Sequence, residues 1–336
     1  MINTTVLLSI VLSLIFCFAL TNGILDGGGI VSTVITTRAM EPLPALVVVA
    51  VCEVLGVFLL GHAVVRTIGL KMIIFPPTAS AREILSVLLA AVAGALAWNL
   101  TMWRLSWPSS SSHALLGGLL GSTWARFGSG AVSWPIVTKV IVGLAVVPLG
   151  AALLSLVSAR LLYWAGQYMT PAVGGILKAI HICVLAGLSL VHGSNDGQKS
   201  IALVLLALLA CGWGTPTAYF PVWVGLTCGI ALGLGAVFGS RRTVQTVGQG
   251  FYRVQSLQGL CAETATMLLV GISSIAGFPV SSSHVMSSSV IGAGAAVRPR
   301  GIRWDLAGSI GLAWLSTIPA AAALAALLSY VVSKAI

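Results

Sequence analysis

Charged side chains are scarce in this sequence, and acidic ones are the scarcest. Asp, Glu, Lys and Arg together make up 7% of the 336 residues, and seven of these residues are acidic. Because a soluble globular protein carries about 25% charged residues, this chain cannot cover a surface that faces water. Its high hydrophobic content excludes intrinsic disorder. The 17 Lys and Arg lie mostly between apolar runs instead of clustering on a basic face, which excludes nucleic-acid binding.

Cysteine pairs with the spacing of metal or redox sites are missing as well. The six cysteines all lie in apolar runs, and none forms a Cys-x-x-Cys motif. This excludes a secreted disulfide scaffold, and the cysteines are interpreted as small packing residues. We expect neither a cofactor nor a resident metal.

Long apolar runs are what the sequence has instead. Hydrophobic residues make up 58% of the chain, and the mean hydropathy is +1.05. A helix needs about 20 apolar residues to cross a bilayer. The runs that reach or approach this length are 2–21, 43–65, 84–103, 140–159, 175–191, 200–240 as two segments, 306–333, and 264–297, which Gly277 and Pro279 divide. They predict an all-α multi-pass protein of the cytoplasmic membrane with about 10–12 transmembrane segments, the first of them a retained helix.

Two apolar segments are too short to cross the membrane alone. They cover 27–38 and 113–125, and the first begins with Gly27-Gly28-Gly29, a run that is costly in an ordinary helix. We expect both to be half-helices or re-entrant segments. Such pieces persist at membrane depth only when they are buried in protein or line a wet cavity.

Two motifs recur about half a chain apart. Pro-x-Ser-Ser-Ser-His occurs at 108–113 and again at 279–284, and Gly-x-x-Asp-Gly occurs at 23–27 and again at 193–197. The offsets are 171 and 170 residues, and this agreement predicts an internal duplication with repeats of 1–168 and 169–336, joined near Pro171. Matching halves with broken helices are typical of secondary transporters whose site lies between the repeats. The basic loops do not decide between parallel and inverted halves.

Four of the seven acidic residues lie inside apolar segments: Asp26, Glu53, Asp196 and Glu263. An ionised carboxylate at mid-membrane costs several kcal/mol unless it is paired, hydrated or neutralised, so such residues mark ion or proton pathways. We expect these four acids, together with Asn22 of the first motif, to bind a coupling cation. The alternative is an acid that an arginine holds at the membrane interface.

The two serine runs supply many hydrogen-bond donors without adding charge. They comprise Ser110, Ser111 and Ser112 in the first repeat and Ser281, Ser282 and Ser283 in the second. Hydroxyl groups and backbone N–H groups at the positive end of a half-helix favour an anion. Two facing helix starts of this kind would cradle a tetrahedral oxyanion. Close packing of small residues is the alternative, and the duplication favours the anion site.

Several further polar residues adjoin these motifs or lie alone. His113 and His284 end the serine runs and suit a capping role, a bond to a backbone carbonyl or proton exchange. His192 opens the second aspartate motif and suits a ligand or supporting role. Lys199 could neutralise the nearby aspartate, contact the anion or extend to the interface. His181 has no motif around it and is interpreted as a packed or interfacial residue.

Charge balance links the two kinds of motif. An oxyanion beside two aspartates in a medium of low dielectric constant would be strongly repelled. A cation must therefore travel with the anion, either as protons on carboxylates or as a bound sodium ion. The residues alone do not choose between these cations.

These motifs resemble those of the inorganic phosphate transporter (PiT) family, in particular its prokaryotic low-affinity branch. The matching segments cover nearly the whole chain and are Asn22–Asp26, Thr36–Met40, Cys52–Gly56, Trp98–Leu100, Pro108–Gly118, His192–Lys199 and Ala262-Glu263. The resemblance implies a symporter of phosphate and a cation, not an enzyme, with inverted repeats and a site at the repeat interface. It also implies that the aspartate motifs bind the cation and that the serine helix starts, with Asn195 and Gln198, bind the anion.

One departure from the family pattern bears on the cation. Leu25 stands where relatives have a polar residue, and Gly28-Gly29 replace an Ala-Asn pair. A cation ligand is then missing from the first repeat, which favours protons over sodium.

Other functions stay open from the sequence. Some relatives carry sulfate, so a sulfate or other oxyanion permease is the nearest alternative. A passive anion channel would need no cation. An intramembrane hydrolase would need one activated serine, whereas the serine runs are duplicated and lack a Gly-x-Ser-x-Gly elbow. A homodimer is also open, because the sequence does not set the oligomeric state.

Overall fold

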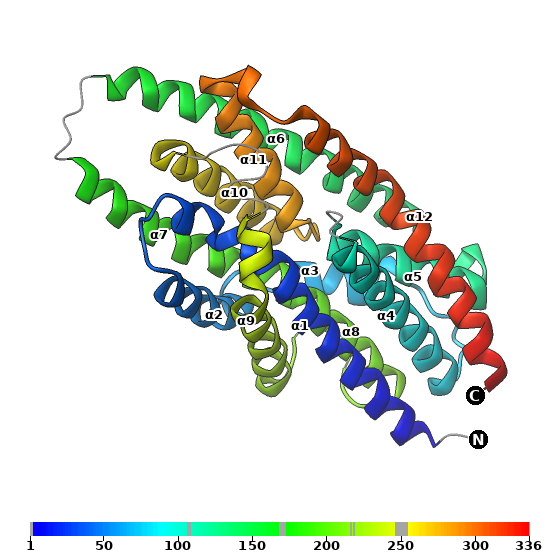
Figure 1. Cartoon of the computed structure of the whole chain (residues 1–336). Coiled ribbons are helices and arrows are strands. Elements are labelled where there is room, and N and C mark those ends of the chain that lie inside the picture. Colours follow the sequence, from blue (N-terminus) through cyan, green and yellow to red (C-terminus); the bar gives the residue numbers. More distant parts are fainter. Residues whose placement is uncertain are drawn as a thin grey trace.

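The computed structural model describes residues 3–105, 109–167, 173–215, 217, 219–245 and 255–335, and it consists of helices (Figure 1). Pro108 of the first serine motif and the expected repeat junction near Pro171 lie outside these ranges. The first half contains α1 (Thr4–Thr36), α2 (Pro42–Leu59), α3 (Ala63–Arg66), α4 (Ala81–Arg104), α5 (Ser111–Phe127) and α6 (Trp134–Gly166). The second half contains α7 (Gly174–His192), α8 (Gln198–Ala210), α9 (Val222–Gln245), α10 (Ser256–Ala276), α11 (Ser282–Val297) and α12 (Trp304–Ala335). The all-α prediction is confirmed.

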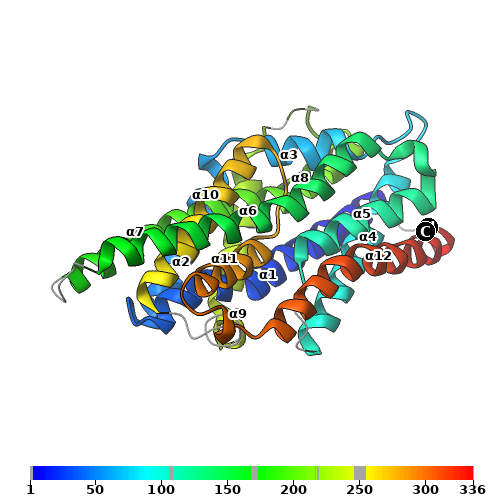
Figure 2. The ribbon, with the colours of Figure 1, turned by 90° about the horizontal axis from the view of Figure 1, so that it is seen from above.

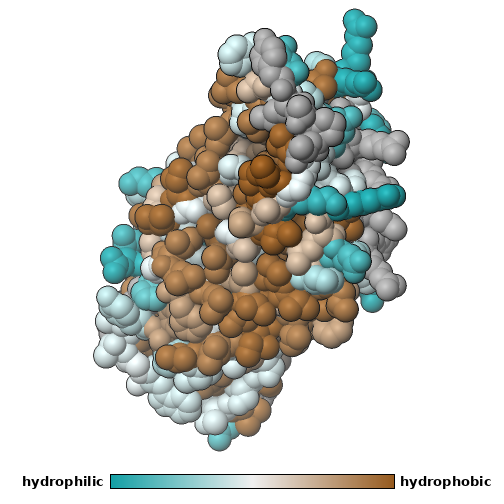
Figure 3. All heavy atoms as spheres, turned by 90° about the vertical axis from the view of Figure 1, so that its left-hand side faces the viewer, coloured by the Kyte–Doolittle hydropathy of each residue, from teal (hydrophilic) through white to brown (hydrophobic). Residues whose placement is uncertain are grey.

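In the described part of the chain, eight helices are long and apolar enough to cross a membrane. They are α1, α2, α4, α6, α9, α10, α12 and the continuous helix in which a π-helical turn, Gly193–Gly197, joins α7 to α8. Their outer surfaces expose large apolar side chains; Leu153 of α6 is 63% exposed and Leu315 of α12 is 77% exposed. Figure 3 shows a broad hydrophobic field on one face, with hydrophilic side chains gathered toward its edges. Such a surface suits lipid and not water, and the protein is a multi-pass membrane protein.

The glycine run of the first repeat does not interrupt its helix. α1 continues through residues 27–29 to Thr36, so the expectation of a separate half-helix over 27–38 is wrong. α1 packs against α9, and a Cβ at Gly27 would collide with Ala236 of that helix. Small residues let membrane helices approach closely, and this packing outweighs the low helix propensity of glycine.

The second short segment behaves as the sequence predicts. α5 has 17 residues and its counterpart α11 has 16, fewer than the about 20 residues with which a helix crosses a bilayer. Most of the side chains of both helices are buried, including Ser111 and Ser282 at their first positions. Both helices are therefore enclosed by protein, as short helices at membrane depth must be.

The helices of the two halves interleave. α6 packs against α10 and α11 of the second half, and α12 packs against α4 and α5 of the first (Figures 1 and 2). Two glycines allow these contacts at equivalent places: a Cβ at Gly121 would collide with the backbone of Ala322, and a Cβ at Gly292 would collide with the backbone of Ala152. The same contact is thus made twice, once by each half. The orientation of each half in the bilayer stays a prediction.

Candidate functional site

Two buried helix starts meet inside the protein. α5 begins after Ser110 and α11 begins after Ser281, and each of these serine hydroxyls accepts a hydrogen bond from the backbone N–H three residues on, at 3.2 Å and 3.4 Å. The two starts are in contact, because the Ser112 hydroxyl donates to the carbonyl oxygen of Val280 at 2.8 Å. A helix start leaves several backbone N–H groups without helical acceptors. The fold brings two such sets of donors together.

Asp26 lies against the start of α5. It shares one face of α1 with Asn22, because the two residues are four positions apart. Ser111 Oγ lies 2.8 Å from Asp26 Oδ2 and 2.5 Å from Asn22 Oδ1, and its single proton can be donated to one of them at a time. The other oxygen of Asp26, Oδ1, is buried and has no hydrogen-bond partner among the described residues. This carboxylate therefore keeps a free acceptor.

Asp196 repeats this arrangement in the second half. It lies in the π-helical turn between α7 and α8, and its Oδ2 accepts a hydrogen bond from the Ser282 hydroxyl. Under the repeat offset this pair corresponds to Asp26 and Ser111. Asn22 Nδ2 donates to Asp196 Oδ1 at 3.3 Å and so connects the two halves. Two aspartates that are far apart in the sequence share one site.

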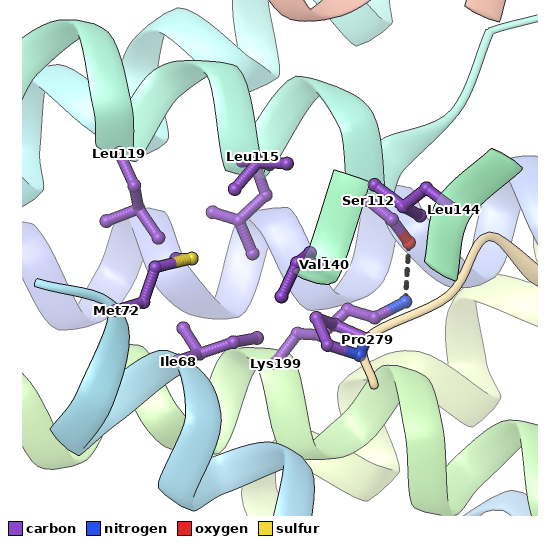
Figure 4. A pocket seen from close by; sticks show the side chains of 10 residues that line it. Ile68, Met72, Ser112, Leu115, Leu119, Val140, Leu144, Lys199 and Pro279 are labelled. Carbon is purple, nitrogen blue, oxygen red and sulfur yellow. Dashed lines mark hydrogen bonds between the residues drawn. The ribbon is translucent and has the colours of Figure 1, made fainter. Parts of the chain in front are cut away.

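A lysine lies beside the second aspartate. Lys199 Nζ is 2.6 Å from Asp196 Oδ1 and 2.6 Å from the carbonyl oxygen of Val280, and it also donates to the Ser112 hydroxyl. The side chain is 1% exposed and borders a small apolar cavity of about 10 Å³, where its ammonium points toward Ser112 (Figure 4). Of the three roles that the sequence allows, this geometry fits neutralisation of Asp196.

His192 connects a third carboxylate to this pair. Its Nδ1 lies 2.7 Å from Glu53 Oε1 of α2, and its Nε2 lies 3.4 Å from Asp196 Oδ2. Potential ligand atoms of Asp26, His192 and Asp196 all lie within 4.8 Å of one another. These three side chains are close enough to surround a cation, and Glu53 reaches them through the imidazole.

Glu263 belongs to a different buried cluster. Its carboxylate accepts a hydrogen bond from the Thr33 hydroxyl and lies 3.2 Å from His181 Nδ1, while His181 Nε2 lies 2.8 Å from the carbonyl oxygen of Ser256. The cluster joins α1, α7 and α10. His181 and Thr33 were missed from the sequence because no motif surrounds them. A buried carboxylate needs a partner, and the chain has five histidines that could serve as one. That small set was the signal in the sequence that could have found His181.

The two amides expected at the anion site make contacts within the protein. Asn195 Nδ2 donates to the Ser274 hydroxyl at 3.0 Å, and Asn195 Oδ1 accepts from the N–H of Val280 at 3.1 Å. Gln198 Oε1 accepts from the N–H groups of Val64 and Val65 at the start of α3, at 3.1 and 3.2 Å. Asn195 thus holds the segment before α11, and Gln198 holds α3. Direct contact of either amide with an anion stays a prediction.

The two motif histidines stack on each other behind the helix starts. The ring centroids of His113 and His284 are 4.9 Å apart, and the His284 ring lies 4.8 Å from that of Trp314. His113 Nδ1 is 2.8 Å from Ser110 Oγ, the capping hydroxyl of α5. These contacts suit the supporting role that the sequence allows. Ser283 is only partly buried, unlike the other five serines of the two serine runs, and its Oγ lies 3.3 Å from Ser281 Oγ.

Comparisons with known proteins agree on one family. The model of the phosphate transporter family matches residues 22–325. A probable low-affinity inorganic phosphate transporter of Rhizobium meliloti (strain 1021) is 34% identical over 311 residues, which cover 92% of each chain. Another protein of that name, from Bacillus subtilis (strain 168), is 30% identical over 332 residues and 98% of each chain. A solved structure titled "The sodium-dependent phosphate transporter" has a TM-score of 0.86 at 20% sequence identity, over 98% of this chain and 100% of that one, which shows a shared fold.

Proposed function

Because the chain belongs to the phosphate transporter family, we propose that it carries inorganic phosphate across the membrane together with a cation, and that this cation is a proton. Phosphate binds between the starts of α5 and α11, at the interface of the two repeats. The protein is a transporter and not an enzyme, so the intramembrane hydrolase is set aside.

The duplicated carboxylate–hydroxyl pair is the observation that carries this proposal. Ser111 contacts Asp26 and Ser282 contacts Asp196, and all four side chains are at most 5% exposed. A buried hydroxyl at a helix start is a suitable donor to an oxyanion, but here each hydroxyl is directed at an acid. The anion ligands and the acids therefore compete for the same protons.

This competition supplies a coupling device. When a cation neutralises the carboxylate, the carboxylate no longer needs the serine hydroxyl, which can turn to the phosphate. Without the cation, phosphate would face unscreened aspartates at close range and be repelled. Cation binding and phosphate binding thereby favour each other, as linkage between neighbouring sites requires.

The choice of the proton rests on what the first repeat lacks. Leu25 and Gly29 stand where the family pattern has polar residues that could serve as ligands. A sodium ion needs several oxygen ligands, whereas a proton needs a single carboxylate oxygen. Asp26 Oδ1, which is buried without a partner among the described residues, suits the proton.

Uptake by purified protein in liposomes tests the proposal. We expect labelled phosphate to accumulate when an inward pH gradient is imposed without sodium, and a sodium gradient at constant pH to drive little accumulation. Accumulation driven by the sodium gradient alone would show that the coupling cation is sodium and not a proton. No accumulation under either gradient would overturn the symport itself, and strong competition by excess sulfate would point to a broader oxyanion permease.

A further inference from the structure

The two aspartate motifs differ at the position three residues after the acid. In the second repeat this residue is Lys199, and in the first repeat the offset of 170 residues places Gly29 there. Residues three positions apart share a helix face, so each lies on the same side as its aspartate. The two sites of an otherwise duplicated arrangement therefore hold different charges.

Lys199 places an ammonium group where a free cation would bind. Its Nζ contacts three oxygens, namely a carboxylate oxygen of Asp196, the Ser112 hydroxyl and the carbonyl oxygen of Val280. Carboxylate, hydroxyl and carbonyl oxygens are the donors that hard metal cations take in proteins. The three N–H groups of the ammonium match these three acceptors, so this position is fully occupied by the chain itself.

The first repeat has no ammonium at the equivalent place. Among the described residues, the buried Asp26 Oδ1 has no hydrogen-bond partner, and a Cβ added at Gly29 would have no heavy atom within 4 Å outside its own helix. Gly29 is itself buried, so this is space inside the protein. A buried carboxylate with a free oxygen requires a counter-charge, and the protein leaves room for one beside Asp26.

We propose that Lys199 is a built-in cation that permanently fills one of two equivalent cation positions, the one at Asp196. Of these two positions, only the one at Asp26 then takes an exchangeable cation, so a single cation travels with each phosphate. This inference rests on the proposed function and specifies its coupling. His192 and Asp196 also have potential ligand atoms within 4.8 Å of one on Asp26, but their side chains belong to the protein and do not count as exchangeable cations. Lys199 cancels the charge of Asp196, and the exchangeable cation cancels that of Asp26.

Adding a lysine to the first repeat and removing the lysine of the second should have opposite effects on the coupling. Gly29→Lys supplies a second built-in cation, so phosphate should still exchange across the membrane but should no longer accumulate in response to a cation gradient. Lys199→Met removes the built-in cation, so one more cation should enter with each phosphate. At a tenfold cation gradient and zero membrane potential, one added cation raises the phosphate accumulation ratio by up to about tenfold.

The experiment uses the full chain in liposomes with the membrane potential clamped. Two readouts are compared, labelled phosphate counterflow and accumulation under the gradient that drives the unmodified protein. Gly29→Met fills the same space without charge, and its accumulation should still respond to the gradient, because the proposed coupling cation is a proton that binds to an oxygen of Asp26 and needs none of that space. The inference is supported if Gly29→Lys shows counterflow without a response to the gradient, while the unmodified protein and Gly29→Met keep that response.

Three results would overturn it. Gly29→Lys could keep the full gradient response, Gly29→Met could lose the response together with Gly29→Lys, or Lys199→Met could show counterflow with an unchanged dependence on the gradient. If Lys199→Met does not reconstitute, the comparison of Gly29→Lys with Gly29→Met is sufficient to test the inference. Failure of the unmodified protein to accumulate phosphate would instead overturn the proposed function, so the two failures are distinguishable.

Discussion

At the residue scale, Asn22 connects the two halves of the site. Its Oδ1 lies 2.5 Å from the Ser111 hydroxyl, and its Nδ2 donates to Asp196. Asn22 is completely buried, so neither its Oδ1 nor its Nδ2 can form a hydrogen bond with water instead. An uncharged residue that offers both an acceptor and a donor is needed here, because a serine hydroxyl lies on one side and a carboxylate on the other.

Asn22→Asp is predicted to impair uptake strongly. The substitution preserves shape but places a carboxylate oxygen where Nδ2 now donates to Asp196, so that two acids face each other at low dielectric. Loss of a hydrogen bond to a charged group costs about 1.5–3 kcal/mol, so we expect initial rates of labelled phosphate uptake to fall at least tenfold. Asn3→Asp, the same change at the exposed N-cap of α1, should stay within about twofold because aspartate caps equally well. Normal uptake by Asn22→Asp would show that Asn22 is not part of the site.

Single residues also show what the sequence could and could not predict. Repetition identified Asp26, Asp196 and the serines, because a duplicated motif marks a shared constraint. It did not reveal His181, whose partnership with Glu263 depends on the packing of α7 against α10. Partners of buried acids that lie far apart in the chain become visible only in three dimensions.

At the scale of elements, small residues set how close the helices lie. Gly121 of α5 meets Ala322 of α12, and Gly292 of α11 meets Ala152 of α6. These contacts hold the two short helices against long helices of the opposite half, and so fix the positions of the helix starts. The sequence predicted the short helix α5 from its length, but it misread the glycines of α1 as a break because propensity says nothing about a neighbouring helix.

Gly121→Ala and Gly292→Ala are predicted to destabilise the protein. An added methyl group at either position would collide with backbone, which cannot rotate away, and overpacking of this kind costs about 1–3 kcal/mol. We expect a melting temperature in detergent that is several degrees lower for both variants. Gly311→Ala in α12, where a Cβ meets no atom within 4 Å, should leave the temperature unchanged or slightly raised. Equal melting temperatures for all three variants would contradict this account of the packing.

At the scale of the whole molecule, the halves form one interleaved structure. The duplicated motifs predicted two repeats, and the structure shows α6 and α12 each packed against the opposite half. That exchange could not be predicted, since a sequence repeat shows which segments are alike and not which of them touch. Interleaving places the starts of α5 and α11 in contact, and through this contact two half-sites become one.

The central claim is that phosphate binds between these helix starts through the duplicated serines. The most direct measurement is the dissociation constant of labelled phosphate for purified protein, by equilibrium dialysis, in the unmodified chain and in the double variant Ser111→Ala, Ser282→Ala. The matched control is Ser122→Ala, which removes a buried hydroxyl of α5 whose one hydrogen bond within the described ranges is to its own helix, at 3.4 Å. We predict that the double variant binds at least about tenfold more weakly while Ser122→Ala binds like the unmodified chain; equal affinity in all three would contradict the account.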